Sequence, residues 1–248
     1  MIKIIAHRGA SELAAQNTLS AFKKANEIGA DGVETDVHMT RDGELVLCHN
    51  YYIDETSDGK GKISDMTLEE LRKYDFGKYF SDEFEGEKIP TLEEMLKCTV
   101  KMKDVFIEIK MPEEERGLVN KTVECIKKHG MENLVTVSSF SLDIIKKVKD
   151  IDVNIKTALI VDMRSPHLAS VLENPEQFCE DNCINQLHMM VLLINKDFVL
   201  RCAKHGIPIA CWTVNDVRAK HLLEEMGVEF IITDKPGIFV GKQGKQAD

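Results

Sequence analysis

The 248-residue sequence contains no apolar run of about 18 residues, the length that a membrane-spanning helix needs. Its first residues, MIKIIA, lack the charged and apolar regions of a secretory signal. The seven cysteines are odd in number and irregularly spaced, and the closest pair, Cys179 and Cys183, has no second pair at zinc-finger spacing. We therefore expect a cytoplasmic protein with reduced thiols and no stable membrane insertion.

The sequence also lacks an excess of positive charge. It has 42 acidic residues against 32 basic ones, and its formal net charge is −10. This balance argues against nucleic acid or an anionic membrane surface as a partner. An anionic small-molecule substrate would instead need local attraction from a few well-placed cations. The sequence does not indicate an oligomeric state.

Strand-like apolar runs alternate with helical patterns along nearly the whole chain. Eight of these runs are typical of parallel strands: IKIIA, GVETDV, VFIEI, LVTVSS, IKTALI, a weaker run near 184–187, PIACWTV and EFIITD. Eight such strands in about 250 residues predict an α/β fold, a (β/α)₈ TIM barrel. An open doubly wound sheet is the alternative, but no glycine-rich nucleotide-binding loop follows any strand.

Residues 51–90 interrupt this alternation. They are charged and dotted with glycine, and they contain one short helical pattern with Thr67 and Glu70 at the positions of a capping box. A structureless stretch of this length is unusual inside a compact domain. We therefore expect one domain over residues 1–248, with 51–90 as a small insertion that forms a lid or rim at one end of the barrel.

Polar residues gather where the predicted strands end. The carboxyl ends of barrel strands carry function, and here they present His7, Arg8, Glu34, Asp36, His49, Glu108, Lys110, Trp212, Thr233 and Asp234. Taken singly, each has an ordinary structural explanation: a strand-end histidine is usually a surface group, and a lone tryptophan usually packs in the core. Taken together, three carboxylates, two cations and two histidines at strand ends indicate a site.

The carboxylates and cations predict what this site binds. Glu34 and Asp36 are two residues apart on one strand, so their side chains share a face. With Glu108 they form a set of hard oxygen ligands that suits a divalent metal, Mg²⁺ or Ca²⁺. Arg8 and Lys110 can hold an anionic substrate, most naturally a phosphate that the metal also binds.

The histidines predict proton transfer. His7 and His49 are placed to act as a general acid–base pair. His38 continues the alternation of the second strand and could be a further ligand. The turn that begins at Arg41 favours a position for His38 outside the barrel mouth.

In this ordered set of motifs the sequence resembles the bacterial glycerophosphodiester phosphodiesterase family of the PLC-like phosphodiesterase superfamily. The resemblance covers nearly the whole chain, including the insertion. The matching motifs are HRG at 7–9, NT at 17–18, ETDV at 34–37, His49, EIK at 108–110, SSF at 138–140, WTVN at 212–215 and TDKP at 233–236.

The resemblance implies metal-dependent hydrolysis of a glycerophosphodiester to an alcohol and glycerol 3-phosphate. It implies that one histidine activates the glycerol 2-hydroxyl, that the other protonates the leaving alcohol, and that water opens a cyclic phosphate. The implied roles are metal ligation by Glu34, Asp36 and Glu108, acid–base catalysis by His7 and His49, and substrate binding by Arg8, Lys110 and Trp212.

The chain departs from the family pattern at two positions. The family usually has glutamate where this chain has Gln16, and aspartate where it has Asn50. These departures leave open a catalytically weak relative that only binds its ligand. Within the same chemistry, a lysophospholipase D-type or cyclising phosphodiesterase is the other alternative.

Overall fold

A closed barrel of parallel strands forms the centre of the protein, as a computed structural model describes it for residues 1–112 and 116–240. The barrel strands are β1 (Lys3–Ala6), β2 (Gly32–Met39), β4 (Asp104–Ile109), β5 (Val135–Ser139), β6 (Lys156–Val161), β7 (Gln186–Met190), β8 (Ile209–Trp212) and β9 (Phe230–Thr233). Each pairs in parallel with its neighbours, and β1 closes the ring by pairing with both β2 and β9. The predicted TIM barrel is confirmed.

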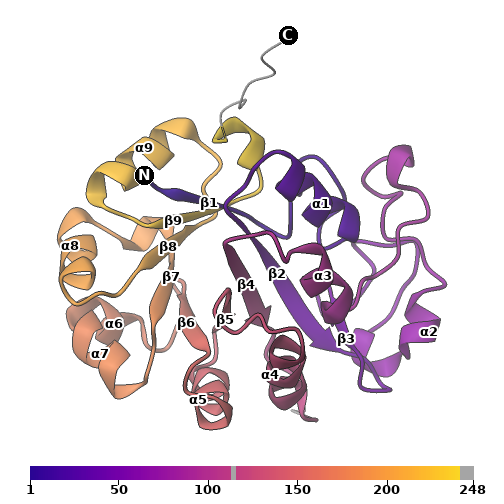
Figure 1. Cartoon of the computed structure of the whole chain (residues 1–248), viewed down its shortest axis with the longest axis horizontal. Coiled ribbons are helices and arrows are strands. Elements are labelled where there is room, and N and C mark those ends of the chain that lie inside the picture. The colour runs from indigo at the N-terminus through magenta and orange to yellow at the C-terminus, as the bar shows by residue number, and fades with distance from the viewer. Residues whose placement is uncertain (113–115, 241–248) are drawn as a thin grey trace.

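Helices surround this barrel (Figure 1). They are α1 (Leu19–Glu27), α3 (Leu92–Cys98), α4 (Leu118–Lys128), α5 (Leu142–Ile151), α6 (Leu168–Glu173), α7 (Pro175–Asp181), α8 (Lys196–Lys204) and α9 (Val217–Met226). Their apolar residues recur at helical spacing and pack against the outside of the sheet. In α1, for example, Phe22 and Ala25 are buried, and the Thr18 side chain caps the helix by accepting from the amide of Ala21.

The inside of the barrel is filled mainly from β1, β4, β8 and β9. Ile5, Phe106, Ala210, Phe230 and Ile232 form this inner cluster, against which Trp212 packs. Because these side chains close the barrel, polar groups at the carboxyl ends of the strands stand on an apolar base.

The weak strand near 184–187 lies slightly later than predicted. β7 covers Gln186–Met190, whereas Ile184 belongs to the turn after α7, where its amide donates to the carbonyl of Cys179. The Asn185 side chain accepts from the amide of Thr157 and so fixes the entry to the strand. The predicted strand began too early because Ile184, an apolar residue in the turn that ends α7, resembles a strand residue in the sequence.

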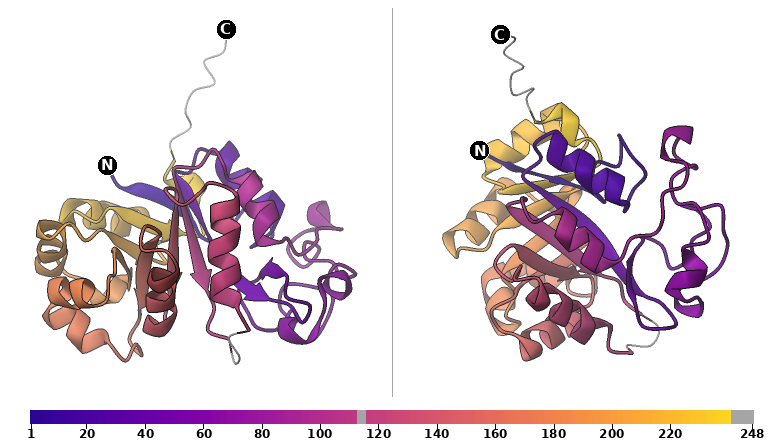
Figure 2. Two further views of the ribbon diagram at one scale, coloured as in Figure 1. Left: turned by 60° about the horizontal axis from the view of Figure 1, so that its bottom comes forward. Right: turned by 45° about the vertical axis from the view of Figure 1, so that its right-hand side comes forward.

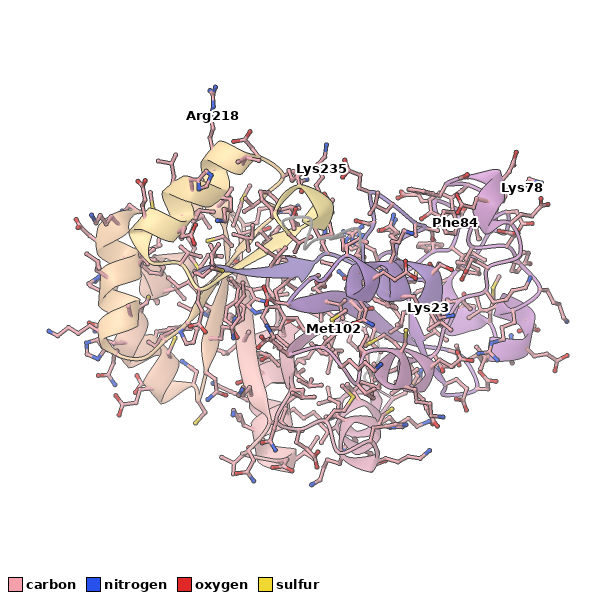
Figure 3. The ribbon with its side chains drawn as sticks, turned by 45° about the horizontal axis from the view of Figure 1, so that its top comes forward. Lys23, Lys78, Phe84, Met102, Arg218 and Lys235 are labelled. Carbon is pink, nitrogen blue, oxygen red and sulfur yellow. The ribbon has the colours of Figure 1, made fainter. Side chains whose placement is uncertain are left out.

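Residues 51–90 form a separate lobe beside the barrel. Strand β3 (Leu45–Leu47) pairs antiparallel with β2 and leads into it. The lobe contains η1 (Ile63–Asp65), α2 (Leu68–Leu71) and η2 (Asp82–Phe84), and the predicted capping box of Thr67 and Glu70 is present. It stands out from the barrel in Figure 2, and Figure 3 shows Lys78 and Phe84 at the end of the molecule away from Arg218 on α9.

This lobe has a small core of its own. Its core residues are Ile53, Ile63, Leu71, Phe76 and Ile89, which pack with Val46 of β3 and with Cys48 just after it. Tyr79 reaches back toward the barrel, where its hydroxyl accepts from the amide of Gln16 at 3.2 Å. Among residues 1–112 and 116–240, every helix is too short or too polar to cross a bilayer.

Candidate active site

The register of the sheet brings three carboxylates together. Asp36 on β2 pairs directly with Glu108 on β4, and Glu34 precedes Asp36 by two residues on the same face of β2. Glu34, Asp36 and Glu108 are 5%, 1% and 8% exposed, and their nearest oxygens all lie within 4.8 Å of one another. The predicted ligand set is therefore assembled at one end of the barrel.

This crowding makes the carboxylates hard to ionise together. Burial, together with the neighbouring charge of Asp36, raises the pKa of Glu34 well above its ordinary value and that of Glu108 to about 7. A divalent cation would offset the mutual repulsion of the three carboxylates and so favour their ionised forms. Three buried oxygen donors from separate strand positions fit Mg²⁺ or Ca²⁺.

Lys110 lies within this cluster. Its Nζ is 2.8 Å from both Asp36 Oδ1 and Glu108 Oε1. Burial would lower the pKa of Lys110, but the charges of Asp36 and Glu108 outweigh it and raise that pKa above its ordinary value. Burial would likewise raise the pKa of Asp36, but Lys110 and Arg8 hold it well below its usual range.

Arg8 approaches the same carboxylates from β1. Its amide donates to Glu34 Oε2 at 3.1 Å, and its Nε lies 3.6 Å from Asp36 Oδ2. Its Nη1 donates to Gln16 Oε1 at 2.5 Å. Arg8 takes a positive φ of 57°, which is uncommon outside glycine and occurs often at functional sites. Its buried Nε has no hydrogen-bond partner among the described residues, which suits it to an anionic ligand.

His7 is held from the opposite end of the chain. Its Nδ1 lies 2.6 Å from Asp234 Oδ1, and its Nε2 lies 3.8 Å from Glu34 Oε2. The Asn215 side chain donates to Asp234 Oδ2 at 2.7 Å and so orients the carboxylate. Burial would raise the pKa of Asp234, but its hydrogen bond to His7 outweighs this and lowers it to about 2.

His49 follows β3 and makes a different contact. Its Nδ1 lies 2.7 Å from Asn50 Oδ1, while Asn50 Nδ2 donates to Glu55 Oε2 at 2.6 Å. Burial, together with Lys110 and Arg8, lowers the pKa of His49 to about 4. An anionic diester next to the ring acts in the opposite direction, because it favours the imidazolium.

His38 lies next to the candidate metal cluster and is not a member of it. Its ring packs edge-on against Tyr51 with centroids 5.1 Å apart, and its Nε2 is 3.5 Å from the carbonyl oxygen of His49. Burial lowers the pKa of His38 to about 4, so the ring is neutral at neutral pH.

One cavity of about 130 Å³ joins nearly all the candidate residues. Of the residues predicted to have a role in the site, its lining includes His7, Arg8, Glu34, His49, Glu108, Lys110 and Trp212. Asp36 does not line it but pairs with Lys110, which does. Trp212 is anchored by its Nε1, which donates to the carbonyl of His188 at 3.0 Å, and its ring meets Phe140 edge-on at 5.9 Å. Trp212 and Phe140 thus form an aromatic wall opposite the charged groups.

Three polar residues of this site had no role in the sequence-based prediction. Asp234 and Asn215 orient His7, as described above. Asn17 donates to Asp36 Oδ2 at 2.9 Å and accepts from Thr35 Oγ1, so it fixes the carboxylate that also binds Lys110. The motifs TDKP, WTVN and NT contained these residues, but only the closed barrel shows what they contact.

Comparison with known proteins agrees with this geometry. The family model described as "Glycerophosphoryl diester phosphodiesterase family" matches residues 7–238. A glycerophosphodiester phosphodiesterase of Caldanaerobacter subterraneus subsp. tengcongensis is 35% identical over 94% of each chain. Glycerophosphodiester phosphodiesterase 1 of Homo sapiens is 31% identical over 94% of this chain and 78% of its own.

Solved structures show the same architecture. An Oleispira antarctica phosphodiesterase, solved in complex with the product sn-glycerol-3-phosphate, matches with a TM-score of 0.87 and 28% identity over 95% of this chain and 94% of its own. A glycerophosphodiester phosphodiesterase of Thermotoga maritima matches with a TM-score of 0.80 and 28% identity over 97% of each chain. Because the family model and these relatives span almost the whole barrel and its site, the chain belongs to the glycerophosphoryl diester phosphodiesterase family.

Proposed function

We propose that this enzyme hydrolyses glycerophosphodiesters to an alcohol and glycerol 3-phosphate with the help of a divalent metal. One observation carries the proposal: three buried carboxylates lie within 4.8 Å of one another, and two of them, Glu34 and Glu108, line a cavity with His7 and His49. The Nδ1 atom of each histidine is held by a neighbouring side chain. The carboxylates suit a metal, the histidines suit proton transfer, and no other charged cluster of the described residues combines both.

Glu34, Asp36 and Glu108 would hold the metal, with Mg²⁺ and Ca²⁺ both compatible with an all-oxygen site. When bound, the metal would draw negative charge from the phosphate oxygens and favour attack at phosphorus. Lys110 already bridges Asp36 and Glu108, so it reduces the repulsion among the ligands as well as facing the substrate.

Arg8 and Lys110 would bind the phosphate. Both line the 130 Å³ cavity, and Arg8 Nε is buried without a hydrogen-bond partner among the described residues. A guanidinium provides several N–H groups in a fixed plane, which suits phosphate oxygens. These two cations supply the local attraction that a chain of net charge −10 needs for an anionic substrate.

His7 and His49 would transfer the protons. One accepts the proton of the glycerol 2-hydroxyl as its oxygen attacks phosphorus, and the other donates a proton to the departing alcohol oxygen. The product of this step is a cyclic glycerol phosphate. Water then adds to phosphorus with the proton transfers reversed, the ring opens at the 2-oxygen, and glycerol 3-phosphate is released.

The two departures from the family pattern preserve hydrogen bonding in the site. Gln16 Oε1 accepts from Arg8, and Asn50 Oδ1 faces His49 Nδ1, so each amide oxygen makes the contact that a carboxylate oxygen could make. This supports turnover over the alternative of a relative that only binds its ligand. The seven cysteines are free thiols, which supports the proposal of a cytoplasmic location.

A substrate panel tests the proposed function. The purified protein is incubated with glycerophosphodiesters and a lysophospholipid, with Mg²⁺, Ca²⁺ or EDTA, and glycerol 3-phosphate is measured by a coupled reaction. We expect glycerol 3-phosphate and free alcohol in equal amounts. Accumulation of cyclic phosphate would indicate a cyclising enzyme, lysophosphatidate from the lysophospholipid would indicate the lysophospholipase D-type alternative, and binding without turnover would indicate a ligand-binding relative.

A further inference from the structure

A second and larger cavity opens beside the catalytic one. It has a volume of about 570 Å³, against about 130 Å³ for the first. The two cavities share His49, Glu108, Lys110 and Phe140 as lining residues, so a molecule held at the carboxylate cluster can extend into both.

The two volumes suit the two halves of a glycerophosphodiester. Every such substrate has the same small glycerol group, whereas the esterified alcohol varies in size. The smaller cavity lies at the barrel end between His7 and Trp212, and it suits the glycerol. The larger one borders the 51–90 lobe and suits the alcohol.

Aromatic side chains form much of the larger cavity's wall. Tyr51, Tyr52 and Phe140 line it and remain 39%, 55% and 37% exposed. The Tyr51 hydroxyl donates to the carbonyl of Met111 at 2.7 Å, which fixes the ring across the start of the lobe. Exposed aromatic faces next to a binding cavity attract cations through the negative charge of their π systems.

The charged side chains that line this cavity are mostly negative. Asp54 and Glu55 line it, and neither forms an ion pair with a cation in the described part of the chain. Besides His49, which is held by Asn50, its lining contains one cationic side chain, Lys110, which is already engaged by Asp36 and Glu108. A negatively charged alcohol would therefore meet uncompensated carboxylates, whereas a positively charged one would meet a favourable potential.

Asn50 connects this wall to the catalytic histidine. Its amide oxygen faces His49 Nδ1, and its amide nitrogen donates to Glu55 Oε2. An aspartate at this position could accept from His49 but could not donate to Glu55, and it would repel that carboxylate. Asn50 thus allows Glu55 to lie next to His49.

We propose that this larger cavity, called here the alcohol cavity, selects glycerophosphodiesters whose alcohol carries an ammonium group. Tyr51, Tyr52 and Phe140 would face the cation, and Asp54 and Glu55 would balance its charge. This inference rests on the proposed function and adds the substrate class. It identifies the 51–90 lobe as the source of the selecting residues Tyr51, Tyr52, Asp54 and Glu55.

The test compares substrates that differ in the charge of the alcohol. We would measure kcat/KM for glycerophosphocholine and glycerophosphoethanolamine against glycerophosphoglycerol and glycerophosphoinositol. For the wild-type protein we expect the two cationic substrates to be preferred by about tenfold or more. Free choline should inhibit competitively, whereas free glycerol at the same concentration should not.

Variants separate selection from catalysis. Asp54→Asn with Tyr52→Leu, and separately Glu55→Gln, should lower kcat/KM for glycerophosphocholine at least five times more than for glycerophosphoglycerol. The matched control Glu124→Gln removes an exposed carboxylate from α4, away from the cavity, and should keep the wild-type ratio.

The outcomes distinguish this inference from the proposed function. Hydrolysis of all four diesters at similar kcat/KM would overturn the inference and leave the function intact. Hydrolysis of none of them, with or without added metal, would overturn the function itself. Preference for glycerophosphoglycerol or glycerophosphoinositol over the two cationic substrates would likewise contradict the inference. Because the wild-type measurements suffice for these outcomes, a poorly folded variant does not affect them.

Discussion

His7 and Asp234 meet at 2.6 Å although 227 positions separate them in the chain. The contact depends on barrel closure, because β1 pairs with β9 and the amide of His7 donates to the carbonyl of Thr233 at 2.8 Å. A carboxylate on the outer nitrogen of a histidine fixes the orientation of the ring and stabilises the imidazolium that forms during proton transfer. The last strand of the barrel therefore positions the histidine that follows the first.

Asp234→Asn should lower turnover by about 10²–10⁴-fold, because the ring of His7 loses both its orientation and its charge partner. Metal affinity should stay unchanged. Asp143→Asn, which changes an exposed carboxylate at the start of α5, serves as the control. Near-normal turnover of Asp234→Asn would show that Asp234 does not act through His7.

His7→Ala and His49→Ala should each lower turnover of an alkyl diester by about 10²–10⁴-fold. The variants should differ with a 4-nitrophenyl diester, whose alcohol leaves without needing a proton. Since the alcohol cavity lies beside His49, His49→Ala should recover much of its rate with this substrate and His7→Ala should not. The ratio of the two rates in each variant measures this, and equal recovery in both would contradict the placement of the leaving group.

The contribution of Glu108 to the stability of the metal-free protein should fall as pH rises from about 4.5 to above 7. The pKa of Glu108 is raised to about 7 by burial and by Asp36, so the folded state binds more protons than the unfolded state across this interval. The contribution of this group to the free energy of unfolding therefore falls with rising pH. His38 and His49, whose pKa values burial lowers from 6.5 to about 4, contribute with the opposite sign below about pH 6.5. Added Mg²⁺ or Ca²⁺ should raise Tm more at pH 8 than at pH 5, because the metal replaces those protons.

Glu108→Gln is the control for this pH effect. The amide cannot ionise, so in EDTA the Tm of the wild type relative to that of the variant should fall as pH rises, because the histidine contributions are common to both proteins. A difference in Tm that stays constant over this range would mean that Glu108 is not crowded as described.

Gln16→Glu should tighten metal binding and weaken substrate binding. Gln16 Oε1 accepts from Arg8 Nη1, so a glutamate there would add negative charge next to the cluster and neutralise part of the charge of Arg8. A metal titration should show a lower apparent Kd, and KM for the diester should rise. Identical titrations for variant and wild type would indicate that the charge at position 16 is screened from the site.

The barrel could be predicted because its strands and most helices follow simple periods and caps. The capping boxes Thr67–Glu70 and Thr91–Glu94 are both present. Helices α6, α7 and α8 were not predicted. α6 and α7 have six and seven residues, and α6 begins after His167 without a side-chain cap. Short helices in a segment of mixed polarity leave little periodic signal.

The sequence predicted the site residues that lie at strand ends, but not the contacts that side chains from separate segments make there. Residues at strand ends, such as Glu34 and Glu108, could be grouped because parallel strands place their carboxyl ends on one side. The contacts of Asn215 with Asp234 and of Asn17 with Asp36 each join side chains 19 positions apart that meet at the barrel end. The link from Asn50 to Glu55 required the actual path of the lobe.

The most direct test of the account is glycerol 3-phosphate formation from glycerophosphocholine by the wild-type protein, with and without its metal. After treatment with EDTA and removal of the chelator, activity should be lost and should return on titration with Mg²⁺ or Ca²⁺. Glu108→Gln should stay folded and need far more metal for the same rate, because one of three ligand charges is gone. Full activity of the wild-type protein in excess EDTA would contradict the central claim that Glu34, Asp36 and Glu108 bind a catalytic metal.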